Sequence, residues 1–223
     1  GIFSFFSYPF AYPFVWVVTF LSIFIITSEY IKPLFSNILI KKIACMFILT
    51  YSLFGSSKLF ERIQAELDWG KASTLALCKS YNETLPTYER LEKMFVSNPY
   101  FLYNYAAVLQ EMKQYTESLE VALKCRQYWA DYDLELIIGE NYQQLNKPEL
   151  AEKYYNSASM MCPSRFLPLY KLFHLYKMNG EKERSLAMAE AVVDKPMKIE
   201  TVAIKRMKRE MEREIQKINI VTE

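Results

Sequence analysis

The chain has 223 residues, of which 52% are hydrophobic, and its 27 Lys and Arg nearly balance its 25 Asp and Glu. A single His and five Gly argue against most catalytic and phosphate-binding sites, which rely heavily on those residues. The balanced charge also argues against nucleic acid as a partner, because nucleic-acid binding needs a basic stripe. No catalytic residue, cofactor or metal site is therefore predicted within this chain.

The first 56 residues are almost free of charge. Their charged side chains are Glu29, Lys32, Lys41 and Lys42. Two apolar runs, at about residues 8–28 and 38–55, approach the roughly 20 residues that a membrane-spanning helix needs. They predict a transmembrane helical hairpin in the lipid bilayer. The second run would also suit a buried core helix of a soluble domain.

The lysines of this N-terminal part predict its orientation. They fall in a short connector at residues 29–42, which overlaps the start of the second run, and short loops rich in Lys stay on the cytoplasmic side. We therefore expect a multi-pass protein of the inner (plasma) membrane, with everything beyond residue 56 on the periplasmic or extracellular side. A signal peptide would require a positive charge before its apolar core, but the first positive charge in this chain is Lys32. The chain also starts at Gly1 rather than at Met. We interpret this end as cut from a longer chain.

Residues 57–98 predict a helical prelude or a degenerate copy of the repeat described below. Leu59, Ile63 and Leu67 recur every four residues, as on one face of an amphipathic helix. Pro86 suits the first turn of a second helix, where its missing N–H costs nothing.

Residues 132–165 carry the pattern of a tetratricopeptide repeat (TPR), a unit of about 34 residues built from two antiparallel helices. Small residues stand where the two helices would cross, large ones stand beside them, and a proline ends the second helix. These residues are Gly139, Tyr142, Ala151, Tyr155, Ala158 and Pro163. Looser copies share the register at residues 99–131 and 166–199, so an α-solenoid is predicted.

Residues 200–223 predict a capping helix, because the last repeat of a solenoid needs a polar outer face. An apolar seam follows helical spacing, and opposite charges four residues apart are expected to pair on the exposed face. The seam comprises Ile204, Met207, Met211, Ile215 and Ile218, and the pairs are Arg206/Glu210 and Lys208/Glu212. The predicted fold class is therefore all-α: a transmembrane hairpin, a tetratricopeptide-type α-solenoid and a C-terminal capping helix.

The cysteines show no metal-knuckle or redox-pair spacing. Cys45 lies in an apolar run, and Cys78, Cys125 and Cys162 fall on predicted helices or at their ends. For these three we favour buried small hydrophobic residues over a disulfide or a reactive thiol.

The first helices of successive TPR units line a groove, and the positions that point into it supply the candidate binding residues. They are Tyr100, Tyr103, Gln110, Glu111, Glu140, Gln143, Gln144, Tyr170, His174 and Lys177. Tyrosine beside Gln and Glu could stack on and hydrogen-bond a protein partner or an envelope glycan. The same residues could also be exposed polar side chains without a ligand. His174 lacks metal-ligating neighbours at helical spacing, so a groove-lining or packed imidazole is favoured.

Several phrases resemble the C-terminal part of O-antigen ligase and polymerase-like membrane proteins that carry a TPR tail. They are FSYPFAYPF at 6–14, FLYNYAAVL at 101–109, IIGENYQQL at 137–145, CPSRFLPLYKLFHLYKMNG at 162–180 and KPMKIETVAIKRMKREM at 195–211. The resemblance implies an inner-membrane, glycosyltransferase-like parent that joins polyprenyl-linked glycans at the periplasmic face. Its catalytic residues are expected outside this chain, so none is assigned here.

Two functions follow from these observations. In the first, the chain is the C-terminal part of a protein of O-antigen ligation or polymerisation, and its periplasmic TPR tail binds protein or glycan. In the alternative, it is a membrane-tethered TPR scaffold that recruits peptide partners in the cytoplasm. A self-contained soluble enzyme is disfavoured, because no nucleophile, acid/base or metal constellation can be placed.

Overall fold

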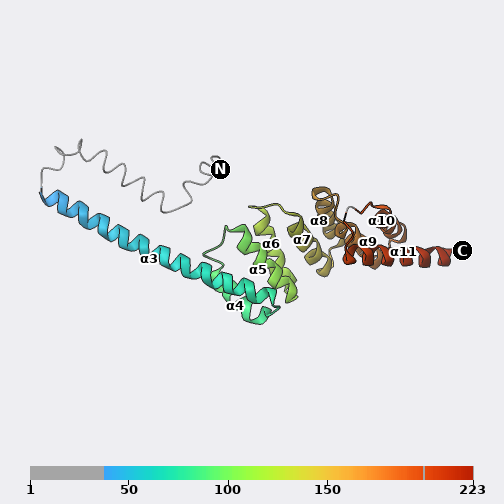
Figure 1. The fold of residues 1–223 in the computed structure, drawn as a ribbon, viewed down its shortest axis with the longest axis horizontal. Coiled ribbons are helices and arrows are strands. Elements are labelled where there is room, and N and C mark those ends of the chain that lie inside the picture. Colours follow the sequence, from blue (N-terminus) through green and yellow to red (C-terminus); the bar gives the residue numbers. More distant parts are fainter. Residues whose placement is uncertain (1–37, 198, 223) are drawn as a thin grey trace. The chain divides into compact units, whose positions relative to one another are not determined.

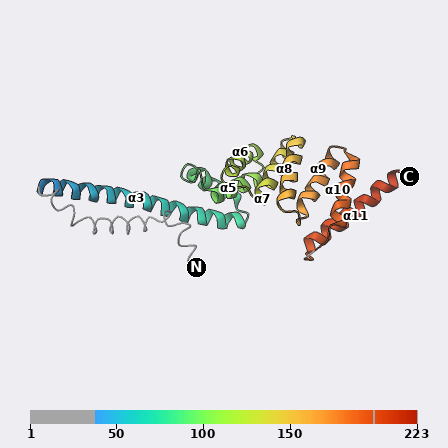
Figure 2. The same ribbon diagram turned by 90° about the horizontal axis from the view of Figure 1, so that it is seen from above.

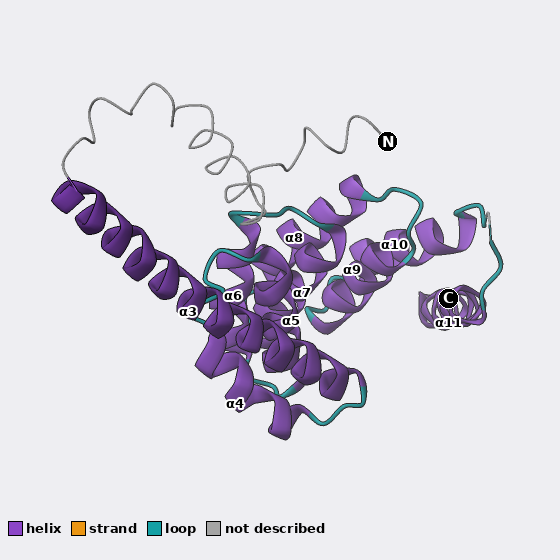
Figure 3. Ribbon diagram, turned by 60° about the vertical axis from the view of Figure 1, so that its left-hand side comes forward, coloured by secondary structure: helices purple, strands orange, loops and turns teal. Residues whose placement is uncertain are grey.

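The computed structural model describes residues 38–197 and 199–222, and all regular structure in these ranges is helical (Figure 3). The helices are α3 (Ile38–Leu77), α4 (Tyr81–Leu91), α5 (Pro99–Glu111), α6 (Tyr115–Arg126), α7 (Tyr132–Gln144), α8 (Pro148–Met161), α9 (Leu167–Met178), α10 (Lys182–Asp194) and α11 (Val202–Thr222). The all-α prediction is therefore confirmed. The chain divides into two units, residues 1–61 and residues 62–223.

In the first unit, the structure describes the N-terminal part of α3. The apolar side chains that the structure describes there are exposed, among them those of Ile43, Met46, Phe47, Tyr51, Leu53 and Phe54. Towards the end of the unit, Lys58 pairs with Glu61 at 2.8 Å and lies over the Phe54 ring.

The predicted transmembrane hairpin is not supported. The span at 8–28 lies outside the described residues, and the span predicted at 38–55 is the first part of α3, which runs on without a break to Leu77. The helix continues because no proline interrupts it and Gly55 alone does not stop a hydrogen-bonded ladder. Lys41 and Lys42 lie inside α3 rather than in a connector. Over residues 38–197 and 199–222, none of the helices combines the length and the apolar character that crossing a membrane requires.

In the second unit, helices pair in chain order: α5 with α6, α7 with α8, and α9 with α10. Each pair also contacts the next, through α6 and α7 and then through α8 and α9, and α11 packs on α10 (Figures 1 and 2). The result is a stack of helix pairs in which each pair buries its apolar face on its neighbours.

The turn inside each helix pair has the same geometry. The middle of its three residues adopts a positive φ in every case: Lys79 at 64°, Lys113 at 61°, Asn146 at 57° and Gly180 at 77°. The next residue donates its N–H to a carbonyl five residues earlier, as from Glu181 to Tyr176, which is the Schellman arrangement that satisfies the last carbonyls of a helix. The turn at Lys79 joins α3 to α4. This recurrence supports the proposal that residues 57–98 contain a degenerate repeat.

The crossing of α7 and α8 is set by a glycine. The Tyr155 ring is fully buried against Gly139, and Ala151 and Ala158 on α8 are buried as well. A Cβ atom on Gly139 would lie 2.6 Å from Cε1 and 2.7 Å from Cδ1 of Tyr155. The two helices can therefore approach this closely only because residue 139 has no side chain.

We accordingly expect Gly139→Ala to lower the free energy of unfolding by about 1–3 kcal/mol, because overpacking a buried contact forces a side chain or the backbone to move. Gly70→Ala is the matched control, since Gly70 lies in α3 with open space around it. There alanine should stabilise the helix by up to about 1 kcal/mol. Chemical denaturation of both variants measures the difference, and a Gly139→Ala protein as stable as the Gly70→Ala protein would contradict the packing argument.

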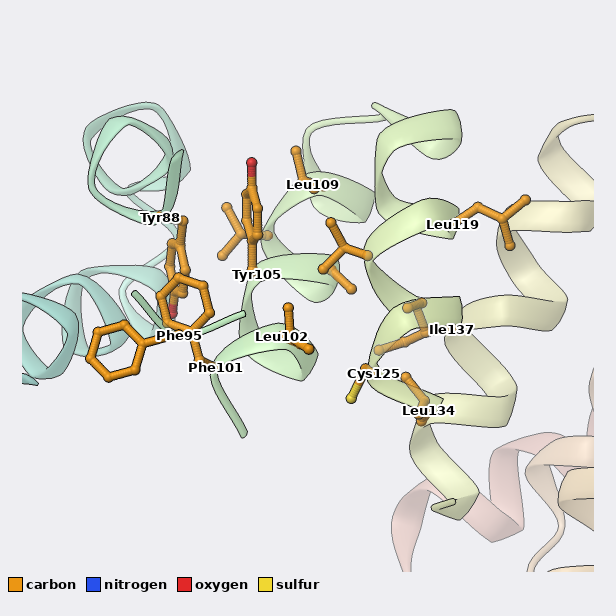
Figure 4. Packing of buried hydrophobic residues seen from close by; sticks show 14 of the residues in the cluster. Tyr88, Phe95, Phe101, Leu102, Tyr105, Leu109, Leu119, Cys125, Leu134 and Ile137 are labelled. Carbon is orange, nitrogen blue, oxygen red and sulfur yellow. The ribbon is translucent and has the colours of Figure 1, made fainter. Parts of the chain in front are cut away.

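The core continues across the pairs. Figure 4 shows Tyr88, Phe95, Phe101 and Tyr105 gathered in a ring cluster, followed by aliphatic side chains towards α7. Within it, Tyr88 and Tyr105 stack with ring centroids 5.5 Å apart, and Phe95 and Phe101 stack at 5.0 Å. Large buried aromatic surfaces of this kind dominate core stability. These rings therefore make the main contact between α4 and the first repeat.

The three cysteines predicted to be buried differ in their exposure. Cys125 is fully buried, and burial raises the pKa of its thiol to about 11, as expected for an inert core residue. Cys162 is half-buried. The prediction is wrong for Cys78, which is exposed, because it follows the last residue of α3 and the turn leads it away from the apolar face.

Candidate binding surface

The predicted binding residues come from the first helix of each pair, α5, α7 and α9. Side chains that are exposed are Tyr100, Glu111, Gln144 and Lys177, and those that are half-buried are Tyr103, Gln110, Glu140, Gln143, Tyr170 and His174. We call the seven of them that lie on α5 and α7 the α5–α7 face. The surroundings of the predicted residues on α5 and α7 differ strongly from the surroundings of those on α9.

At the N-terminal end of α5, aromatic rings gather at the surface. Tyr100 is 64% exposed, and its ring centroid lies 5.5 Å from that of Trp129, which also meets Tyr103 edge-on at 5.8 Å. Trp129 stands in the connection between α6 and α7. Sequence reasoning missed it, because it lies between helices and outside the positions that the repeat assigns to the groove.

Two carboxylates follow this aromatic group. Asp131 caps α7, its Oδ1 accepting the N–H of Asp133 at 2.9 Å, a favourable arrangement at a helix N-terminus. Partial desolvation and the neighbouring Asp131 raise the pKa of Asp133. Burial, followed by the charges of Asp133 and Asp131, raises the pKa of the Tyr103 hydroxyl.

The middle of the α5–α7 face is a hydrogen-bonded seam. Gln110 donates to the Asn141 side chain at 3.2 Å and to the Ile137 carbonyl at 3.3 Å. Asn141 in turn donates to Ser118 at 2.8 Å, and Ser118 to the Ala106 carbonyl at 2.8 Å. Because Asn141 and Ser118 are fully buried, this chain of bonds fixes the register between two repeats. Gln110 thus holds the repeats together, which the groove prediction did not foresee.

Further along, polar residues of α7 reach the next helix pair. Gln143 accepts the Tyr155 hydroxyl at 2.8 Å and donates to the Met178 sulfur at 3.3 Å. Glu140 pairs with Lys171 of α9 at 3.0 Å. Gln144 and Glu111 are exposed at the C-terminal ends of their helices.

On the third repeat, α11 supplies partners for every predicted residue. Glu210 accepts the Tyr170 hydroxyl at 2.9 Å and lies 3.5 Å from Nε2 of His174, and Glu214 pairs with Lys177. The predicted pair Arg206/Glu210 is therefore replaced by contacts between helices. Lys208 likewise does not pair with Glu212 but donates to the carbonyls of Val193 and Lys195, at 2.5 and 2.6 Å.

The imidazole of His174 is packed against aromatic rings. It meets the rings of Tyr170 and Phe173 edge-on, with centroids 4.4 and 5.0 Å away. Burial lowers the pKa of His174, against the opposing influence of Glu210. Among the described residues, no three His, Cys, Asp or Glu side chains gather closely enough to hold a metal ion.

Stacked antiparallel helix pairs, with one turn geometry recurring every 33 or 34 residues and small residues at the crossings, define the class of this protein. It is a tetratricopeptide-like α-solenoid. Solved structures of that class agree with this assignment, although no family model and no curated protein matches the chain.

Three solved structures illustrate the likeness. The MamA RS-1 ArsTM double mutant matches with a TM-score of 0.60 at 14% identity, over 71% of this chain and 85% of that one. MamA 41-end from Desulfovibrio magneticus RS-1 gives 0.52 at 20% identity, over 66% and 76%. YrrB, described as a TPR protein with an unusual peptide-binding site, gives 0.51 at 18% identity, over 57% and 66%. At these identities the likeness shows the fold.

Proposed function

We propose that this chain is a TPR scaffold that recruits a partner protein by binding an extended peptide on the α5–α7 face. The observation that carries the proposal is the aromatic group at the end of that face, where Tyr100 is 64% exposed and the half-buried Trp129 packs beside it. Tyrosine and tryptophan at a surface supply large contact area with a polar edge, which is why they recur as anchors of protein interfaces. The peptide-binding site named for YrrB, whose fold is similar, supports the same class of ligand.

The third repeat would contribute little to such a site. Its predicted residues already contact Glu210 and Glu214 of α11, so a ligand would have to displace the helix that covers them. We therefore place the peptide on α5 and α7, between the aromatic group and the exposed Gln144.

A display selection of random peptides on the full chain, followed by affinity measurement, tests this proposal. Tyr100→Ala should weaken the selected peptides at least fivefold, because the loss of an aromatic anchor costs upwards of about 1 kcal/mol. Met160→Ala, which truncates a side chain that is 75% exposed on α8, serves as the matched control. If Tyr100→Ala binds as tightly as Met160→Ala, the α5–α7 face is not the binding surface.

Two further proposals concern the side of the membrane on which the chain lies and whether it binds a glycan. The phrases that resemble O-antigen ligases support a periplasmic tail that binds protein or glycan, and the exposed apolar side chains of α3 between Ile43 and Phe54 support attachment to a bilayer or another apolar surface. The comparisons favour the alternative of a peptide-recruiting scaffold, because their likeness is to TPR proteins.

A reporter fused after Glu223 and active on only one side of the membrane separates these proposals. A periplasmic signal would support a tail that meets envelope glycans, and a cytoplasmic signal would contradict it and leave the tethered scaffold. Release of the chain from membranes by carbonate would contradict a spanning hairpin in either case.

A further inference from the structure

The aromatic group on α5 lies beside acidic rather than basic side chains. Asp131 is half-buried and Asp133 is exposed at the start of α7, while Tyr100 and Tyr103 flank Trp129 from α5. Trp129 lies two residues before Asp131 in the connection to α7, and the Asp131 side chain accepts the N–H of Asp133 at 2.9 Å, so the rings and the charges adjoin at the start of α7. We call these five residues the aromatic–acidic patch.

The positive charges around the patch leave it acidic. Arg165 is the base that acts on Asp133, and it lies over the Tyr132 ring with its guanidinium carbon 5.8 Å from the centroid. Arg126, the last residue of α6, pairs with Glu135. In the described parts of the chain, neither Asp131 nor Asp133 has a Lys or Arg within ion-pair distance.

We infer that the aromatic–acidic patch is the subsite for a Lys or Arg side chain of the partner peptide, an inference that rests on the proposed function. The aromatic faces attract a cation within about 6 Å of their centroids, and Arg or Lys over Tyr and Trp is the usual form of this contact. The two carboxylates supply the opposite charge at the rim. An acidic peptide would meet repulsion from Asp131 and Asp133, and a purely apolar one would leave both charges unused.

The sharpest test compares peptides in which the basic residue is replaced by an uncharged residue of the same length. Arginine and citrulline differ in charge while sharing a planar end group, and lysine and norleucine share a similar apolar stem. If the patch selects a cation, the neutral counterparts should bind about five- to thirtyfold more weakly, as expected for loss of a cation–π contact with a carboxylate beside it. The preference should also shrink as salt screens the carboxylates.

The experiment is a pair of display selections with the same random decapeptide library, one on the full chain and one on an Asp131→Asn/Asp133→Asn variant. Asparagine keeps the cap of α7, because its side-chain oxygen serves at that position as well as that of aspartate. Thermal melting should therefore be nearly unchanged and serves as the folding control. Asp194→Asn, at an exposed position on α10, is the matched control for loss of a surface carboxylate.

We expect peptides selected on the unaltered chain to carry Lys or Arg at one recurrent position, and that recurrence to be lost on the double variant and kept on Asp194→Asn. Peptides that depend on Tyr100 but lack a basic residue would overturn this inference and leave the proposed function standing. Peptides that bind equally with and without the Tyr100 ring would overturn both.

Discussion

Replacing Met211 with alanine is expected to lower the free energy of unfolding by about 2–5 kcal/mol, the cost of removing a fully buried large apolar side chain and leaving a cavity. Met211 is fully buried against Phe166, Phe173, Ala189 and Val192. These four residues come from the end of the α8–α9 connection, from α9 and from α10. Met211 is therefore the fully buried centre of the contact by which α11 covers the apolar end of the third repeat, with Ile204, Met207 and Ile215 packed around it.

Val202→Ala provides the control, because Val202 belongs to the same helix and is 84% exposed. It should change stability by no more than about 0.5 kcal/mol. Denaturant unfolding of the full chain with far-ultraviolet dichroism measures both. Equal, small effects of the two variants would mean that α11 is a loosely attached tail, and the third repeat would then be free to receive a ligand.

The fold was predictable because close helix crossings require small residues at fixed intervals. Gly139, Ala151 and Ala158 follow the TPR pattern, and the structure places all three at a buried crossing. The apolar seam of α11 was visible for a similar reason, since Met211 and its neighbours recur at helical spacing. In this seam the side chain of Ile218 lies outside those that the structure describes. What periodicity predicts is which face of a helix is buried.

The candidate surface was harder to predict, because a position in a repeat does not say what lies opposite. His174 and Lys177 occupy groove positions in the sequence, yet Glu210 and Glu214 lie against them. Pairs such as Arg206/Glu210 looked local because both residues share one helix. A charged residue pairs with a partner 30 or 40 residues away, rather than with one on the next turn of its own helix, when packing holds the distant partner nearer. Trp129 escaped notice because loops have no period.

For α3, the sequence predicts a helix boundary that the structure does not have. The apolar run at 38–55 predicts a separate span, whereas the helix extends to Leu77 and uses its C-terminal part to pack on the first repeat. There the Trp69 ring meets Phe101 of α5 edge-on at 5.7 Å, and two contacts reach α4: Ser73 lies 3.2 Å from the Tyr88 hydroxyl, and Asp68 pairs with Arg90 at 2.8 Å. Composition changes near residue 56, but backbone hydrogen bonding does not, because helix propagation needs only the absence of a strong breaker.

Arg126→Met is expected to cost up to about 3 kcal/mol, the lower end of the loss for a buried ion pair, because Glu135 is fully buried while the Arg126 side chain is 41% exposed. Glu135 on α7 has no exposed surface, and its Oε1 accepts the Nε of Arg126 from α6. The guanidinium also lies 5.3 Å from the centroid of the Tyr154 ring on α8. Removing it leaves a buried carboxylate without its cation, and it also loosens the contact between two helix pairs.

A set of four variants isolates this effect from a general loss of packing. Arg90→Met removes an arginine from the exposed pair with Asp68 and should cost less than about 1 kcal/mol. Glu135→Gln should cost less than Arg126→Met, because it leaves no buried charge. The double variant Arg126→Met/Glu135→Met should recover much of the lost stability, since an apolar pair of similar volume often replaces a buried ion pair without penalty. If the double variant is as unstable as Arg126→Met alone, the contact with Tyr154, rather than the stranded charge of Glu135, is what Arg126 contributes.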